Sequence, residues 1–188
     1  AALIGVSALA GVDVEDHVQI MAHRGASHDA PENTLTSIQA AIEARADWVE
    51  IDVQETADGQ VVVLHDSDFM KLAGVDLKIW DATLDDLSDI DIGSWFDPQF
   101  EDQRVATLDD VLRACKGKIG INIELKYYGH DQQLEQRTAD LVDAREMASE
   151  VMYMSLDKDG VAKMKELRPD AKVGLLMSVA AGGVRNIQ

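Results

Sequence analysis

The chain is poor in the groups that crosslink proteins or bind nucleic acid. It has a single cysteine, Cys115, so a disulfide framework within the chain is excluded. Its 17 lysines and arginines stand against 35 aspartates and glutamates, which gives a formal net charge of −18 at pH 7. This acidic balance lacks the basic footprint of a nucleic-acid-binding protein. An anionic substrate would also be repelled unless its binding site carried local positive charge.

Long hydrophobic runs are also missing. The most apolar stretch, residues 1–10, is about half of the ~20 residues needed to span a bilayer. No basic segment precedes it, as one would in a signal peptide. We expect residues 1–17 to be an apolar segment or linker, with the end of a transmembrane helix as one alternative. Residues 18–188 are expected to form one domain.

The remaining pattern alternates short apolar runs with helical periodicity. Such alternation predicts an α/β fold with mostly parallel strands, either a barrel or a doubly wound sheet. A closed eight-stranded barrel needs ~250 residues. The 188 residues therefore predict a barrel truncated after about six strands, or an open sheet. The expected strands are Val18–Ala22, Trp48–Gln54, Val61–His65, Gly120–Lys126, Val151–Ser155 and Lys172–Met177.

One connection is too short for a crossover helix, which takes a dozen or more residues. It runs from Gln54 to Gln60 and contains Ala57-Asp58-Gly59, a turn signal. A hairpin is expected here, with Asp52 opposite Leu64 or His65. By contrast, residues 66–106 form a long insertion with five of the nine aromatic residues. We expect a cap packed by these aromatics beside the site.

Two pairs of charged residues lie on otherwise apolar strands. Glu50 and Asp52 are two positions apart, so both side chains leave the same face. Adjacent carboxylates repel one another unless a cation or a proton joins them. Mg²⁺ or Ca²⁺ would suit their oxygen ligands, and a polar face open to water is the alternative. Glu124 and Lys126 repeat the spacing, and the same metal with a bound anion would explain both.

Two histidines lie where predicted strands end. His23 is followed by Arg24, whose fork suits phosphate oxygens, and by Gly25, which allows a tight backbone near a ligand. His65 ends the third strand. Because sites in parallel α/β folds gather at the carboxyl ends of strands, we expect the histidines to act as general acid and base.

These motifs, in this order, resemble those of the glycerophosphodiester phosphodiesterase family. The resemblance runs from about His23 to Met177. The family implies a TIM-type (β/α)8 barrel with a small insertion after the third strand, here residues 66–106. The motifs are His-Arg-Gly-Ala-Ser, Pro-Glu-Asn-Thr, Glu-Ile-Asp-Val-Gln-Glu-Thr-Ala-Asp-Gly, Val-Val-Val-Leu-His-Asp and Ile-Glu-Leu-Lys.

The resemblance also implies a reaction. It is the metal-dependent hydrolysis of glycerophosphodiesters to an alcohol and glycerol 3-phosphate, in which the substrate's own 2-hydroxyl attacks to form a cyclic phosphate that water opens. A small-molecule glycerophosphodiester is therefore the expected partner. The implied roles are metal binding by Glu50, Asp52 and Glu124, acid–base catalysis by His23 and His65, and substrate binding by Arg24, Lys126 and Glu32.

Two alternatives stay open at this stage. One is a lysophospholipase-D-like enzyme that uses a similar site on lipids, and the other is an inactive truncated domain that binds metal or phosphate. The first 18 residues and the run from Lys126 to His130 are also similar to bacterial members with a membrane region before the catalytic domain. A membrane-associated bacterial protein is therefore expected rather than a freely cytoplasmic one.

Overall fold

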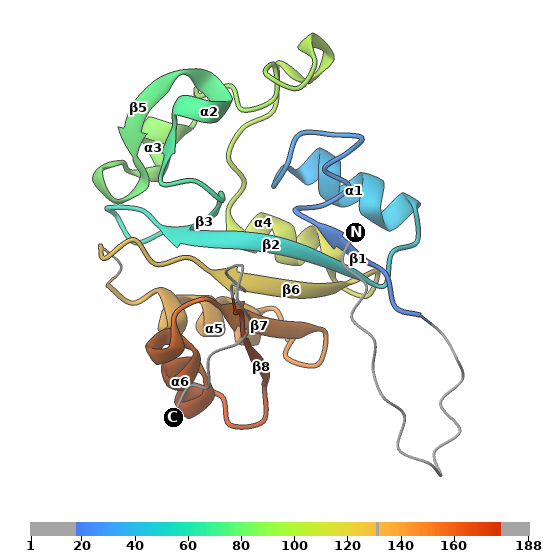
Figure 1. The fold of residues 1–188 in the computed structure, drawn as a ribbon, viewed down its shortest axis with the longest axis vertical. Helices are drawn as coiled ribbons and strands as arrows, with labels where there is room; N and C mark the ends of the chain where they lie inside the picture. The colour runs from blue at the N-terminus through green and yellow to red at the C-terminus, as the bar shows by residue number, and fades with distance from the viewer. Residues whose placement is uncertain (1–17, 131, 178–188) are drawn as a thin grey trace, which may run out of the picture.

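A six-stranded sheet forms the centre of the molecule (Figure 1). The structure is a computed structural model that describes residues 18–130 and 132–177, so the apolar segment predicted at 1–17 lies outside the described residues. The strand order is β1-β2-β6-β7-β8, and all of these strands are parallel. Their bounds are Met21–His23 for β1, Trp48–Glu55 for β2, Gly120–Leu125 for β6, Val151–Ser155 for β7 and Lys172–Leu175 for β8.

The sixth strand confirms the predicted hairpin. β3 (Val61–Val63) runs antiparallel to β2 and pairs with its second half, while β1 pairs with its first half. The turn holds Gly59 at a φ of 75°, where a side chain would be strained. Val63 lies opposite Val53, so Leu64 comes opposite Asp52, and the Leu64 amide donates to the Asp52 carbonyl at 3.0 Å.

Helices cover one face of the sheet. Thr34 and Thr107 are the N-caps of α1 and α4, and each forms a capping box. On the face of the sheet that the helices cover, Val49, Ile51 and Val53 of β2 are fully buried in one core with these helices. Each such side chain contributes about 1.5–3 kcal/mol of burial free energy. The four helices are α1 (Leu35–Glu43), α4 (Leu108–Cys115), α5 (Leu134–Ala144) and α6 (Lys158–Leu167).

Three strand boundaries differ from the prediction by two or more residues. β1 starts at Met21 rather than Val18, and Val18 and Ile20 are exposed. β3 ends at Val63 rather than His65, and β8 ends at Leu175. The edge strands β1 and β8 are also more exposed than β2 and β6, because among the described residues each is paired on one side only. The apolar composition of a segment therefore does not fix where strand pairing begins or ends.

The insertion at 66–106 forms a small lobe beside the end of β2 and β3 (Figure 1). Its own core is aliphatic apart from Phe69, so the prediction of a cap packed by several aromatics was wrong. Trp95 is exposed and meets Phe96 edge to face. The elements are β4 (Asp68–Phe69), α2 (Met70–Ala73), β5 (Val75–Lys78), η1 (Ile79–Asp81), α3 (Leu84–Leu87) and η2 (Pro98–Phe100).

Candidate active site

The two histidines approach the same edge of β2 from opposite directions. β1 runs parallel to β2 and ends with His23 opposite Glu50. β3 runs antiparallel to β2, and the chain leaves it past Leu64, opposite Asp52, to reach His65. Both imidazoles therefore come to the stretch of β2 that carries the predicted carboxylate pair. The short turn between β2 and β3 makes this arrangement a consequence of local geometry.

Three carboxylates meet on the inner face of the sheet. Glu50 and Asp52 share that face of β2, and the register of β6 places Glu124 beside Asp52. One ligand oxygen from each residue lies within 4.8 Å of the others. Their exposed fractions are 2%, 0% and 9%, respectively. The structure thus brings together the three residues that the sequence proposed as metal ligands.

The carboxylate charges of this cluster are close together and buried, and some of their oxygens lack donors among the described residues. Burial and the neighbouring Asp52 carboxylate raise the pKa of Glu50 to about 8. Within the described part of the chain, Oε1 of Glu50 and Oδ1 of Asp52 are buried without a hydrogen-bond partner. Buried carboxylate oxygens without donors are costly, and a hard divalent cation takes such oxygens as ligands. The residues present therefore fit a Mg²⁺ or Ca²⁺ ion.

Lys126 supplies positive charge next to the carboxylates. Its Nζ lies 3.0 Å from Oε1 of Glu124 and 3.7 Å from Oδ1 of Asp52. Burial of the amine opposes its charge, but the hydrogen bond to Glu124 and the charges of Glu124 and Asp52 outweigh that effect and raise the pKa of Lys126. Lys126 is therefore a fixed cation beside the place where a metal would bind.

Arg24 contacts the cluster with both its backbone and its side chain. Its amide donates to Oε2 of Glu50 at 2.8 Å, and its Nε lies 3.4 Å from Oδ2 of Asp52. The residue has a φ of 56°, in the left-handed region that non-glycine residues rarely adopt. The next residue, Gly25, has a φ of 79°, and a Cβ there would lie 2.3 Å from Oγ of Ser37. The Gly25 backbone thus lies close to Ser37, and its predicted approach to a ligand stays a prediction.

Asn33 is a site residue whose contact with the carboxylates the sequence did not reveal. Its Nδ2 donates to Oδ2 of Asp52 at 2.9 Å, and its Oδ1 accepts from the Asp52 amide at 3.3 Å. It is buried and has a φ of 58°. Thr34, and not Asn33, caps helix α1, so the Asn33 side chain is available to bind Asp52. The available sequence signal for Asn33 was its place in the Pro-Glu-Asn-Thr motif. Asparagine also tolerates a left-handed backbone better than most residues.

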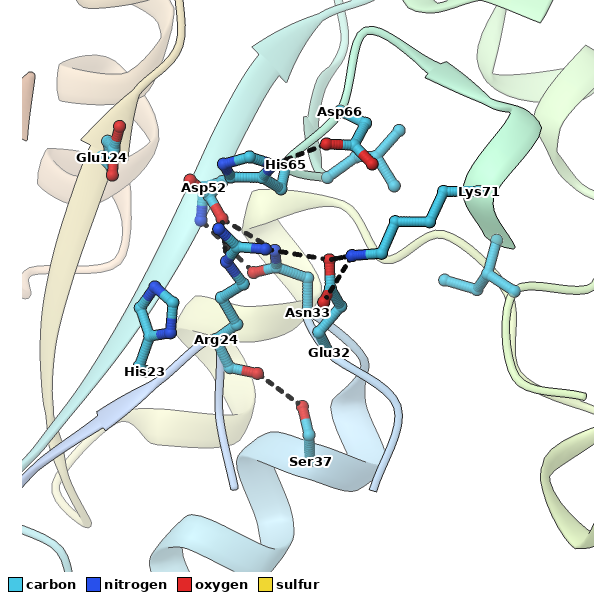
Figure 2. Close-up of polar contacts among 12 residues, drawn as sticks. His23, Arg24, Glu32, Asn33, Ser37, Asp52, His65, Asp66, Lys71 and Glu124 are labelled. Atoms are coloured by element: carbon cyan, nitrogen blue, oxygen red, sulfur yellow. Dashed lines mark hydrogen bonds and ion pairs between the residues drawn. The ribbon is translucent and has the colours of Figure 1, made fainter. Parts of the chain in front are cut away.

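Glu32 pairs with two cations. Its Oε1 accepts from Nη1 of Arg24 at 3.1 Å, and both of its oxygens lie 3.0 Å from Nζ of Lys71 in the insertion. Figure 2 shows Glu32 between these two side chains. The sequence placed Glu32 near the substrate but gave no sign of Lys71, which comes 39 residues later.

His65 is held from two sides. Its Nδ1 lies 2.7 Å from Oδ1 of Asp66, and its carbonyl accepts from the hydroxyl of Tyr128 at 2.8 Å. Asp66 stood in the recognised motif without an assigned role, and its adjacency to His65 was the available signal. Pairing at Nδ1 leaves Nε2 as the ring nitrogen for chemistry.

His23 is more open than His65. About 68% of its side chain is exposed, and its Nε2 lies 3.8 Å from Oε2 of Glu50. Partial desolvation of the ring and the nearby Arg24 charge lower the pKa of His23. A neutral imidazole is thereby favoured at this edge of the site.

A cavity of about 300 Å³ adjoins Glu124 and Lys126. It lies between the ends of β6 and β7 and has both polar and apolar walls. The lining residues are Glu124, Leu125, Lys126, Tyr127, Tyr128, Ser155, Leu156 and Asp157.

Comparison with known proteins identifies the family to which the chain belongs. Residues 23–182 match the Glycerophosphoryl diester phosphodiesterase family. The chain belongs to this family. The *Bacillus subtilis* protein YhdW is 36% identical over 159 residues, which cover 84% of this chain and 65% of YhdW. A glycerophosphodiester phosphodiesterase of *Caldanaerobacter subterraneus* subsp. *tengcongensis* is 31% identical over 163 residues, with 84% of this chain and 65% of the relative covered.

Solved structures of the family share the fold. An *Oleispira antarctica* phosphodiesterase, solved in complex with the product sn-glycerol-3-phosphate, matches with a TM-score of 0.80 and 27% identity. The match covers 88% of this chain and 68% of that one. The match confirms the predicted TIM-type α/β fold, and the described residues form a sheet of six strands. The chain spans about two thirds of the length of these family members.

Proposed function

We propose that the chain carries the catalytic site of a metal-dependent glycerophosphodiester phosphodiesterase. Its substrate is a glycerophosphodiester, and its products are an alcohol and glycerol 3-phosphate. The observation that carries the proposal is the buried Glu50, Asp52 and Glu124 cluster with both histidines beside the same strand. Membership of the family and the product named for the *Oleispira antarctica* structure support the same substrate class.

The cation would be held by the carboxylate cluster of Glu50, Asp52 and Glu124. When bound, it would neutralise charge on the phosphate and polarise it for attack. Mg²⁺ and Ca²⁺ both suit three carboxylates, and the cluster does not by itself choose between them. The cation would also offset the two effects that raise the pKa of Glu50, which are its burial and its repulsion by Asp52.

Arg24 and Lys126 would bind the phosphate. Both lie against Asp52, from opposite neighbouring elements, and both are fixed by carboxylates before any substrate arrives. Their charges overcome locally the repulsion that a net charge of −18 exerts on an anion. Glu32 lies within this group through its contact with Arg24.

The histidines would move the protons. His65, with Asp66 on its Nδ1, is suited to take a proton from the attacking hydroxyl, because Asp66 stabilises the imidazolium that forms. His23, neutral until it binds a proton from solvent, would give one to the leaving alkoxide. The attacking group is proposed to be the substrate's own 2-hydroxyl, with water opening the resulting cyclic phosphate.

Membrane association through residues 1–17 stays a proposal. In the ranges that the structure describes, no helix has the length and apolar character required to cross a membrane. A vesicle flotation assay on the full chain, compared with a variant lacking residues 1–17, would test the proposal. Equal recovery of both proteins with the vesicles would contradict it.

Steady-state assays with glycerophosphocholine and lysophosphatidylcholine test the function. Turnover of the first, lost on chelation by EDTA and restored by Mg²⁺ or Ca²⁺, is the expected result. Turnover of the lysolipid alone would favour the lysophospholipase-D-like alternative. A metal-loaded, folded protein that turns over neither would support the inactive binding domain.

A further inference from the structure

A lysine of the insertion reaches the phosphate-binding arginine through one carboxylate. Lys71 lies in α2, and its Nζ is 3.0 Å from both oxygens of Glu32. Glu32 in turn accepts from Nη1 of Arg24, whose Nε lies 3.4 Å from Asp52. Figure 2 shows these side chains following one another from the insertion to β2. The row joins a lobe with its own core to the centre of the site.

The row is more enclosed than a surface ion pair. The side chains of Glu32 and Arg24 are 14% and 17% exposed, respectively. Lys71 is 46% exposed, and its Nζ lies 5.6 Å from the ring centre of Trp95, which shields it on one side. Charges in such a setting are screened less than charges in open solvent. The Lys71–Glu32 contact can therefore influence the neighbouring guanidinium.

The charges along the row show what Lys71 adds. Without Lys71, the Glu32 carboxylate would offset the charge of Arg24 and reduce its attraction for a phosphate. With Lys71, the two cations share the Glu32 carboxylate, so Glu32 offsets less of the Arg24 charge than it would alone. Because both Glu32 oxygens lie near Lys71 and one also contacts Arg24, the carboxylate is held in one orientation. That orientation fixes Nη1 of Arg24.

We propose that Lys71 is a positioning residue for phosphate binding. Acting through Glu32, it holds the Arg24 guanidinium in place and preserves its positive potential toward a phosphate mono- or diester. This inference rests on the proposed function, because it assigns Arg24 to the phosphate. It gives the insertion a part in substrate affinity, and it makes Glu32 the link between Lys71 and Arg24.

The rival explanation is that Lys71 only latches the insertion onto the domain. A latch would change the melting temperature and leave the phosphate affinity of the folded protein unchanged. A positioning role would change affinity for any ligand with a phosphate, whichever alcohol it carries. Inhibition by glycerol 3-phosphate therefore separates the two explanations, because this product has a phosphate but no second ester group.

The test compares Lys71→Met and Lys71→Arg with Lys78→Met as the matched control. Lys78 belongs to the same insertion and pairs with Asp68, away from Arg24. We expect Lys71→Met to raise both the KM for glycerophosphocholine and the inhibition constant of glycerol 3-phosphate about threefold to fivefold, with kcat changed less. Lys71→Arg should keep most of the wild-type affinity for both ligands, and Lys78→Met should match the wild-type protein.

A double-mutant cycle with Glu32→Gln tests whether Lys71 acts through Glu32. Residues in one ion-pair network show non-additive effects. Additive effects on the inhibition constant, or an unchanged constant in Lys71→Met, would overturn the inference while leaving the proposed function intact. If the wild-type protein turns over no glycerophosphodiester, the proposed function fails. Calorimetric binding of glycerol 3-phosphate to the same variants then tests Lys71, and a wild-type protein that does not bind it overturns both.

Discussion

The backbone amide of Arg24 donates a 2.8 Å hydrogen bond to Oε2 of Glu50, so the proposed phosphate-binding residue is tied to a proposed metal ligand. The same residue reaches Asp52 with its side chain. Its left-handed backbone has a φ of 56°, and such conformations cost on the order of 1–3 kcal/mol and persist only where surrounding contacts demand them. The proposed metal and phosphate sites are therefore connected through Arg24, so we expect a change at one to affect the other.

Substitution of Arg24 by lysine tests the guanidinium while keeping the charge. Lysine retains the backbone bond to Glu50 but cannot reach Asp52 and Glu32 together with a planar fork. We expect kcat/KM for glycerophosphocholine to fall roughly 10- to 100-fold, as for loss of charged hydrogen bonds. Arg45→Lys is the control, because Arg45 also has a left-handed backbone (φ 58°) but follows α1. Similar losses in both variants would point to backbone strain instead.

Removal of His65 tests the acid–base assignment. His65→Ala should lower kcat by at least about 10²-fold, the usual contribution of a positioned general base. Asp66→Asn should reduce kcat by a smaller factor with KM nearly unchanged, because it leaves the imidazole present but less well oriented. His28→Ala is the control, since that side chain is fully exposed on a loop. Full activity of His65→Ala would rule the assignment out.

Addition of a divalent cation should stabilise the domain. A ligand that binds only the folded state at about 100 times its Kd adds roughly 2.7 kcal/mol to the unfolding free energy. We expect Mg²⁺ or Ca²⁺ to raise the melting temperature, and EDTA to reverse the increase. Asp52→Asn should abolish the response. Glu135→Gln should keep it, because Glu135 is equally buried but pairs with Lys163 on the helical side. A cation response that survives in Asp52→Asn would place the ion elsewhere.

The parts of the site that could be predicted are those set by short-range rules. The two-residue spacing of Glu50 and Asp52 fixes a common face, and the short turn at Gly59 brings β3 back along β2. Strand alternation predicts neighbouring parallel strands, but the register that sets Glu124 beside Asp52 depends on how whole elements pack. The spacing of Glu124 and Lys126 suggested that Glu124 shares the metal, and the resemblance implied the same role, but neither gave the register.

The parts that could not be predicted depend on side chains meeting across folded elements. Lys71 reaches Glu32 from a helix of four residues in an insertion whose periodicity is too short to reveal a face. The hydrogen bond from Asn33 to Asp52 depends on a left-handed backbone at Asn33, which no rule of sequence spacing predicts. The aromatic residues of the insertion were misjudged for a related reason, because an aliphatic core was already sufficient to fill a lobe of this size.

The ion pair between Asp109 and Arg145 should make stability depend on pH. Arg145 donates to both oxygens of Asp109 at 2.6 Å, joining α4 to the end of α5, and this hydrogen bonding lowers the pKa of Asp109 in the folded protein. In the unfolded chain the pKa returns to about 3.9. The stabilisation is therefore complete above that value and is lost as the pH falls through the lower, folded pKa. We expect Asp109→Asn to lower the melting temperature at pH 7 and to differ less from the wild-type protein near pH 3. Asp89→Asn, at an exposed position of the insertion, is the control, and an equal deficit of Asp109→Asn at both pH values would show that packing rather than charge accounts for its effect.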